Sequence, residues 1–242
     1  MPRFFVNESE INDHTIKVMG DNFNHITNVL RYKVGDEITI SDGNGMDYLC
    51  IIKAINKDDI ITNIVDIISN DAEPSIQVTL YQALPKADKM ELIIQKCIEI
   101  GVTKIVPVVT EHTIVNISNK ESKKLARWNK IAESAAKQCG RGIIPIVDNV
   151  ATFKEAIKDS TKLDKVIIPY EREKENSLKS IIKDFKGSNI GIFIGPEGGF
   201  SNAEINLAID NGVQPITLGK RILRTETAGM VTLAILLHEL EN

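Results

Sequence analysis

The sequence has few cysteines, no long apolar run and no excess of positive charge. Cys50, Cys97 and Cys139 are odd in number and far apart, so neither a disulfide framework nor a zinc site is expected. No segment approaches the roughly 18 unbroken apolar residues of a membrane span, which predicts a cytoplasmic protein without a membrane partner. A formal net charge of −4 over 242 residues excludes a protein that coats nucleic acid indiscriminately.

Charge and pattern both divide the chain near residue 70. Residues 1–70 hold 6 Lys and Arg against 11 Asp and Glu, whereas residues 71–242 hold 23 against 22. The acidic part carries one helical pattern, NFNHITNVLR, and three strand-like runs, RFFV, DEITISDG and DYLCIIKAI. The polar run SNDAEPS then reads as a linker. We therefore expect a small β-rich domain over 1–70 and a second domain over 75–242.

Beyond residue 75, apolar runs alternate with helical patterns. The runs are QVTLYQAL, KIVPVVT, KVIIPY, NIGIFIG and PITLG, and helices are expected to begin near residues 87, 122, 153, 177, 203 and 226. Apolar strands that alternate with helices are typical of an α/β fold, a mostly parallel sheet with helices on both faces. Ligands bind at the carboxyl ends of such strands, where IGPEGG and TLGKRILR lie.

The stretch IGPEGGFS gathers glycines and a proline around Glu197. Glycines let a backbone approach a ligand closely, but neither the Rossmann nor the P-loop spacing is present. A carboxylate suits a ligand that is neutral or cationic where it is contacted, as S-adenosylmethionine is. A plain strand-to-helix turn, with Ser201 and Glu204 as a capping box, explains the same residues. The loop alone leaves both explanations open.

The run LGKRILRTETAGMV places Arg221, Arg224 and Glu226 at the start of the closing helix. Thr225 is expected to cap this helix, and Glu226 complements the positive end of its dipole. Helix stability does not explain the two arginines, which therefore favour a site. The helix is apolar nearly all round, so we expect it to be buried, with a second subunit covering its outer face.

The segment KESKKLARWNKIAESAAKQCGR has a basic face opposite an apolar one when drawn as a helix. We expect this face to contact RNA phosphates rather than to be a solvated surface only. Arg141, at a helix end flanked by glycines, is expected to come nearest the target nucleotide. The basic face consists of Lys123, Arg127, Lys130, Lys137 and Arg141.

IGPEGGFSNAE and LGKRILRTETA, preceded by DKMELIIQKCIEIGV and AAKQCGR, resemble the bacterial 16S ribosomal RNA uridine-N3 methyltransferases of the SPOUT class. PRFF and NHITNVLR are similar to that family's PUA-like, β-barrel RNA-binding domain. The resemblance implies a deep trefoil knot, a homodimer, and RNA contacts at Arg3 and Arg31. It also implies that S-adenosylmethionine is held by Ile194, Gly195, Pro196, Glu197, Gly198, Leu218, Gly219, Ile222 and Leu223.

The function expected from this resemblance is methylation of N3 of a specific uridine in 16S rRNA, within an assembled small ribosomal subunit. Arg224 is the candidate for stabilising the uridinate and Glu226 the candidate base, and no metal is required. Two alternatives stay open: a knotted methyltransferase with a different RNA target, and an RNA-binding assembly factor without catalysis.

Overall fold

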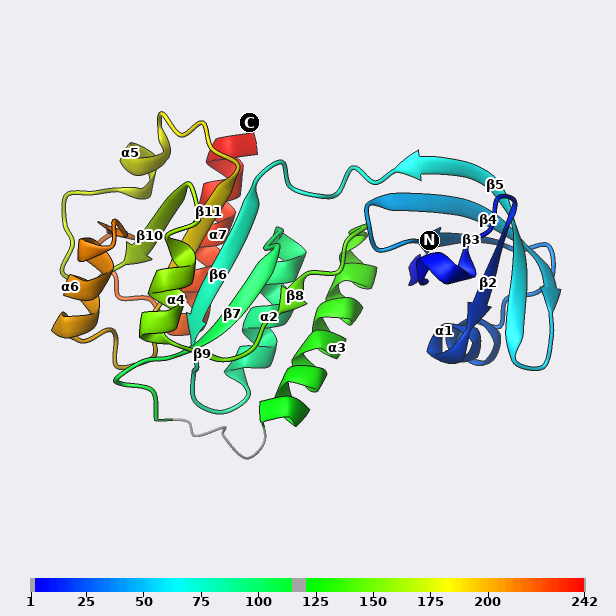
Figure 1. The fold of residues 1–242 in the computed structure, drawn as a ribbon, viewed down its shortest axis with the longest axis horizontal. Helices are drawn as coiled ribbons and strands as arrows, with labels where there is room; N and C mark the ends of the chain where they lie inside the picture. The colour runs from blue at the N-terminus through cyan, green and yellow to red at the C-terminus, as the bar shows by residue number, and fades with distance from the viewer. Residues whose placement is uncertain (1–2, 115–120, 242) are drawn as a thin grey trace. The chain divides into compact units, whose positions relative to one another are not determined.

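The computed structural model describes residues 3–114 and 121–241 and divides into two compact units. One unit comprises Met1–Glu73 together with Ala136–Ile144, and the other comprises Pro74–Ala135 and Pro145–Asn242. Each unit has its own sheet and its own apolar core (Figure 1). The sequence pattern places Ala136–Ile144 in the second domain, whereas in the structure this segment packs with the first unit.

The first unit is a curled five-stranded sheet with short helical turns. Its elements are β1 (Arg3–Phe5), η1 (Glu8–Glu10), β2 (Thr15–Met19), α1 (Gly20–Asn24), η2 (His25–Val29), β3 (Glu37–Ser41), β4 (Met46–Ile55) and β5 (Asp59–Ser69). The strand order is β1-β3-β4-β5-β2, with only the β1–β3 pair parallel. Phe4, Ile16, Ile38, Cys50 and Ile60 are in its core. The sequence pattern predicted β1, β3 and β4 and missed β2 and β5.

The helical segment after β2 differs from its sequence pattern. An α-helix would place Phe23, Ile26, Val29 and Leu30 on one side, but only Ile26 is fully buried. Val29 is 67% exposed and Leu30 is 37% exposed. The cause is η2, a π-helical turn, because its wider turn rotates the following residues away from the α-helical face.

The second unit is built on a parallel sheet, as the alternating pattern predicts. Its strands are β6 (Gln77–Ala83), β7 (Lys104–Val109), β8 (Ile146–Val147), β9 (Ala151–Thr152), β10 (Lys165–Pro169), β11 (Asn189–Ile194) and β12 (Gln214–Ile216). The order is β12-β10-β11-β6-β7-β8, with β9 also paired to β7, and every pair is parallel. The loops after β6, β7 and β11 therefore leave the same edge of the sheet.

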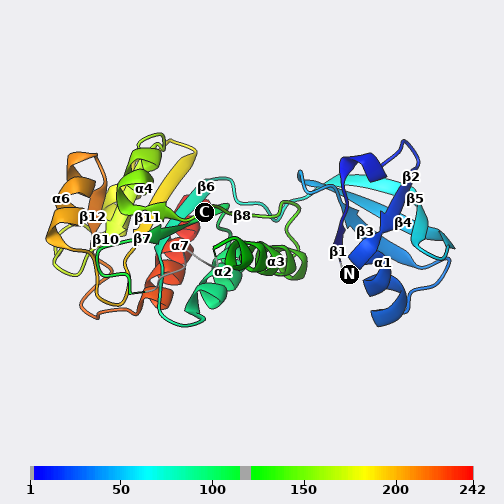
Figure 2. The same ribbon diagram turned by 60° about the horizontal axis from the view of Figure 1, so that its bottom comes forward.

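Helices of the second unit begin within two residues of their predicted positions. They are α2 (Lys89–Ile100), α3 (Glu121–Cys139), α4 (Phe153–Ser160), α5 (Leu178–Ile182), α6 (Asn202–Asp210) and α7 (Thr225–Glu241). Helices α4 and α6 cover one face, where Phe153 packs with the stacked rings of Tyr81 and Phe193. Helices α2 and α7 cover the other face and pack against each other (Figure 2).

Helix α7 is less buried than its composition predicts. Leu233, Leu236 and Leu237 are buried within the chain itself, but Ile235 is 41% exposed. The inner side of α7 is therefore buried within the chain, and its outer side, which a second subunit is expected to cover, is exposed in the single chain. No helix in residues 3–114 and 121–241 is both long and apolar enough to cross a membrane.

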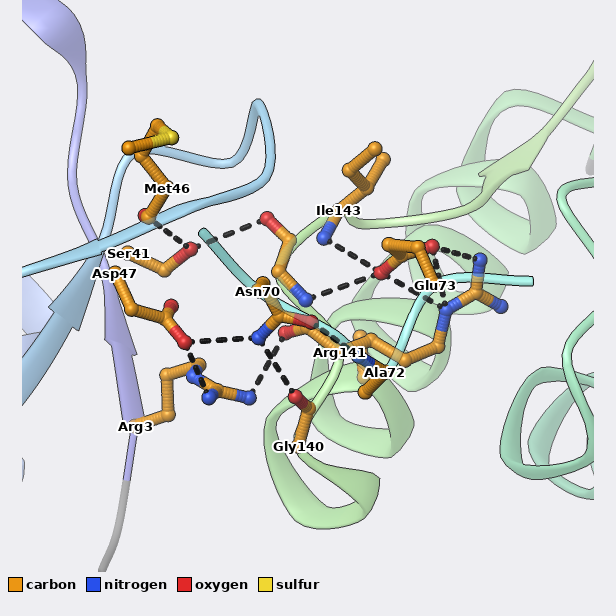
Figure 3. Close-up of polar contacts among 12 residues, drawn as sticks. Arg3, Ser41, Met46, Asp47, Asn70, Ala72, Glu73, Gly140, Arg141 and Ile143 are labelled. Carbon is orange, nitrogen blue, oxygen red and sulfur yellow. Dashed lines mark hydrogen bonds and ion pairs between the residues drawn. The ribbon is translucent and has the colours of Figure 1, made fainter. Parts of the chain in front are cut away.

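Polar contacts fasten Ala136–Ile144 to the rest of the first unit (Figure 3). The Asn70 amide donates to the Gly140 carbonyl (3.1 Å) and to Asp47 (2.8 Å), and the Ser41 hydroxyl donates to the Gly142 carbonyl (3.1 Å). Gly142 has to be small, because a Cβ there would lie 2.7 Å from Asn70 Cβ. The segment thus fits the unit by shape as well as by hydrogen bonds.

The strongest of these contacts is the pair between Glu73 and Arg141. Arg141 is 2% exposed, and its Nη2 lies 2.7 Å from Glu73 Oε2. The other oxygen, Oε1, accepts the backbone N–H groups of Gly142 and Ile143, both at 3.0 Å. One carboxylate therefore satisfies a buried guanidinium and two backbone donors together.

We predict that Glu73→Ala destabilises the first unit by about 3–5 kcal/mol, because it removes the carboxylate that pairs with a buried guanidinium and accepts two backbone N–H groups. Urea unfolding followed by circular dichroism measures the change. Glu99→Ala is the matched control, since Glu99 belongs to a partly exposed Lys96–Glu99 pair, and it should cost at most about 1 kcal/mol. Equal midpoints for the two variants would contradict the prediction.

Candidate active site

Loops after β6, β7 and β11 meet the start of α7 at the carboxyl edge of the second sheet. Thr225, the first residue of α7, is 5% exposed. Its hydroxyl donates to the carbonyl of Gly195 (2.7 Å) and accepts from the side-chain amide of Gln82 (2.9 Å). Thr225 therefore links the glycine-rich loop to the loop that precedes α7, the two loops in which the sequence motifs predict a site. Its expected role as the helix cap is wrong, because it lies inside the first turn of α7 and its hydroxyl makes these two bonds.

The glycine-rich loop turns tightly against the loop after β7. Gly199 has a φ of 69°, in the left-handed region that favours glycine, and its N–H donates to the Pro196 carbonyl. A Cβ on Gly198 would lie 3.1 Å from the Cβ of His112. Nδ1 of His112 lies 3.1 Å from the Gly198 oxygen and 3.0 Å from the Gly199 oxygen. Since carbonyls only accept, this nitrogen carries the proton.

The loop also has the capping box that the sequence predicts. Ser201 Oγ accepts the N–H of Glu204, and Glu204 Oε2 accepts the N–H of Ser201. The same carboxylate reaches the β7 loop, where its Oε1 accepts the N–H of Glu111 (2.9 Å). The turn and the assembled loop cluster are therefore compatible, and the capping box does not argue against a site.

Three charged side chains meet at this edge. The Lys89 ammonium lies 2.9 Å from Glu197 Oε1 and 3.3 Å from Glu226 Oε2. Burial alone would raise the pKa of Glu197, but the hydrogen bonds from Lys89 and from the Lys86 N–H outweigh it and lower that pKa. The hydrogen bond to Glu197, followed by the ion pair with Glu226, raises the pKa of Lys89. The cluster is thus two carboxylates and one ammonium.

The loop after β12 is more open than the glycine-rich loop. Ile222 is 88% exposed, Arg221 and Arg224 are exposed, and Leu218 and Leu223 are partly buried. Gly219 has a φ of 99° with open space around it. The arginines thus stand in solvent at the entrance of α7, and they are not buried with the helix.

Three arginines of the first unit, Arg3, Arg31 and Arg141, are expected to contact RNA, but two of them bind other protein groups. Arg3 is paired with Asp47, and its Nη1 donates to the Arg141 carbonyl (3.3 Å). Arg141 is buried against Glu73. Only Arg31 of this group is exposed, and its φ of 58° is uncommon for a residue other than glycine. We attribute structural roles to Arg3 and Arg141 in this conformation.

The basic side of α3 is exposed along its first part. Trp128 and Ala132 are buried on one side, while Lys123, Arg127 and Lys130 are exposed. Arg127, whose side chain is 67% exposed, still reaches Glu91 of α2 at 2.7 Å. Further along, the partly buried Lys137 donates to Asn22 (3.2 Å). The stripe presented to solvent is therefore shorter than the helical projection indicates.

Comparison with known proteins identifies the family. The profile described as the RNA methyltransferase domain matches residues 72–237, and the one described as the RNA methyltransferase PUA domain matches residues 19–65. The chain belongs to this RNA methyltransferase family. The resemblance noted from IGPEGGFSNAE and LGKRILRTETA is thereby confirmed.

Relatives match the whole length of the chain. Proteins named ribosomal RNA small subunit methyltransferase E are 32% identical in Bacillus subtilis (100% of this chain, 98% of the relative) and 36% identical in Mesomycoplasma hyopneumoniae (96% and 97%). A solved structure of that enzyme from Neisseria gonorrhoeae, bound to S-adenosyl methionine, has a TM-score of 0.86 at 32% identity and covers 98% of this chain and 97% of its own. A putative methyltransferase from Legionella pneumophila, with SAM bound, has a TM-score of 0.86 at 28% identity (98% and 96%).

We predict that Thr225→Val destabilises the second unit by about 1–3 kcal/mol, because the Gly195 carbonyl loses its hydroxyl donor and the Gln82 amide loses one of its two acceptors. Thr225→Ser keeps the hydroxyl and should lose less. Chemical unfolding monitored by Trp128 fluorescence measures both. The prediction fails if the serine variant is destabilised as much as the valine variant.

Proposed function

We propose that the protein transfers a methyl group from S-adenosylmethionine to N3 of a specific uridine in 16S rRNA of the small ribosomal subunit. The observation that carries the proposal is the junction at Thr225, whose hydroxyl joins the glycine-rich loop to the start of α7. The relatives' names and their bound donor support the reaction class. The assignment of N3 and of uridine derives from the motif resemblance.

The chemistry of this edge fits the donor. Glu197 and Glu226 outnumber the single ammonium of Lys89, which favours a ligand with a cationic sulfonium over one with a phosphate. A Cβ at Gly195 would lie 3.1 Å from the ring of Phe200. Glycine is therefore the residue that fits this position beside the donor loop. The residues proposed to hold the donor are Ile194, Gly195, Pro196, Glu197, Gly198, Leu218, Gly219, Ile222 and Leu223. When bound, S-adenosylmethionine supplies an electrophilic methyl group.

The chain's own task is to stabilise the uridine without its N3 proton. That proton has a pKa roughly two units above neutrality, so its removal costs about 3 kcal/mol at pH 7. We assign to Arg224 the stabilisation of negative charge on the uracil oxygens, because its guanidinium is exposed two residues before Glu226. Glu226, at the first turn of α7, is the proposed acceptor of the proton.

RNA binding is proposed for the exposed cations only. Four side chains are exposed and can contact RNA phosphates: Arg31 in the first unit and Lys123, Arg127 and Lys130 on α3. The acidic first unit favours a structured particle as substrate over free RNA, and with a ribosomal substrate the proposal includes a cytoplasmic location. The proposal includes the homodimer and the trefoil knot that the family resemblance implies, and the exposed Ile235 on α7 is consistent with a covering subunit.

Nucleoside mass spectrometry of 16S rRNA tests the assignment. A strain without this gene should lack 3-methyluridine, and the wild-type gene should restore it. Purified protein should then methylate small subunits from that strain faster than free 16S rRNA. Loss of a methyl group from another RNA would identify a different target, and an unchanged set of modified nucleosides would favour the assembly factor.

We predict that Arg224→Ala lowers turnover by about 10²- to 10³-fold and leaves donor affinity nearly unchanged, because it removes one donor to developing charge. Steady-state kinetics and calorimetric titration measure the two quantities. Arg221→Ala, in the same exposed loop, is the matched control and should retain most activity. Equal losses in turnover and donor affinity would make Arg224 a donor-binding residue instead.

A further inference from the structure

Lys89 is not used by the reaction described above, although it lies in the middle of the charged cluster. It is the first residue of α2, directly after the loop that follows β6. Its ammonium bridges the glycine-rich loop through Glu197 and the start of α7 through Glu226. A single side chain therefore joins three segments that are distant in sequence.

The backbone just before Lys89 has an unusual conformation and makes a second contact with Glu197. Ala87 has a φ of 55°, in the left-handed region that residues other than glycine seldom adopt. This bend allows the Lys86 N–H to donate to Glu197 Oε1 (3.2 Å), the same oxygen that accepts from Lys89. Strained backbone of this kind persists where surrounding contacts determine it, and it concentrates at functional sites.

Glu226 depends on Lys89 more than Glu197 does. Its Oε2 atom is buried and has no hydrogen-bond partner among the described residues. The only ion pair of Glu226 among those residues is the one to Lys89, at 3.3 Å. The Glu226 side chain is 15% exposed, so water screens this pair less than it screens a pair on the open surface.

We propose that Lys89 is a positioning residue for methyl transfer: its ammonium holds Glu197 of the donor loop and Glu226 at the uridine side in fixed relation. This inference rests on the proposed function for its catalytic consequence. Without the ammonium, two carboxylates would face each other, and their repulsion would separate the glycine-rich loop from the start of α7. The first effect is loss of local order, and the second is loss of alignment between donor and uridine.

Hydrogen exchange of the unliganded protein tests the positioning role directly. Lys89→Gln should speed exchange in peptides that cover residues 195–201 and 225–231, by about tenfold if one charge-assisted bond is lost. The matched control is Lys96→Gln, which removes a lysine from the same helix and breaks the exposed pair with Glu99. Lys89→Arg keeps the charge and should preserve most of the protection. Glu197→Gln cuts the same bond from its other end and should reproduce the faster exchange in residues 195–201.

Kinetics then separates positioning from simple stability. Lys89→Gln should lower both donor affinity and turnover by about tenfold or more, and Lys89→Arg should restore most of each, while the unfolding midpoint of the arginine variant stays near that of the unchanged protein. Exchange and donor affinity that match those of Lys96→Gln would overturn the proposal. If the unchanged protein bound no S-adenosylmethionine, the proposed function would fail, and the exchange comparison would still decide the role of Lys89.

Discussion

Parallel pairing of β6 with β11 is the constraint on which the candidate site depends. The register runs from Gln77 opposite Asn189 to Gln82 opposite Ile194, so both strands end at the same level. The loop after β6 brings Lys86 and Lys89 to this edge, and the loop after β11 brings Glu197. A shift of one residue in this register would turn alternate side chains to the opposite face of the sheet and separate these groups. The charged cluster thus depends first on the pairing of β6 with β11, which brings the two loops together, and then on the charged side chains that the loops carry.

Much of the second unit could be predicted from its sequence because its longer strands are largely apolar and because α4, α5 and α6 each begin at a side-chain cap. Ser201 with Glu204 and Thr152 with Glu155 form capping boxes that are legible in the chain. The glycine-rich loop was predicted for the same reason, since its residues are adjacent in sequence. The family was predicted from the resemblance of the motifs, because hydrophobic periodicity and composition indicate a fold class and do not identify a family.

The missed features all depend on residues that are distant in sequence. Lys89 stands in the quoted run DKMELIIQ, but nothing local indicates that it meets two carboxylates more than a hundred residues away. His112 shows no ligand spacing, and its contact with the Gly198 carbonyl exists only because the strands β7 and β11 end at one edge. Arg141 follows a basic helix face, so its charge indicated RNA, whereas burial against Glu73 gives it a different partner. A helical projection predicts the direction in which a side chain points, but it does not show which residue, distant in sequence, that side chain will contact.

The first unit consists of two separate segments of the chain, which are synthesised at different times. Strands β1 to β5 leave the ribosome first, yet Ala136–Ile144 completes the unit. Until that segment emerges, Glu73 has no guanidinium to bind, and the amide of Asn70 has no Gly140 carbonyl to meet. Domains generally fold as units during synthesis, but this one is finished only after α2, β7 and α3 of its neighbour have been made. The N-terminal sheet therefore lacks its last segment while residues 74–135 are being synthesised, so the first unit can be completed only after much of α3 has been made.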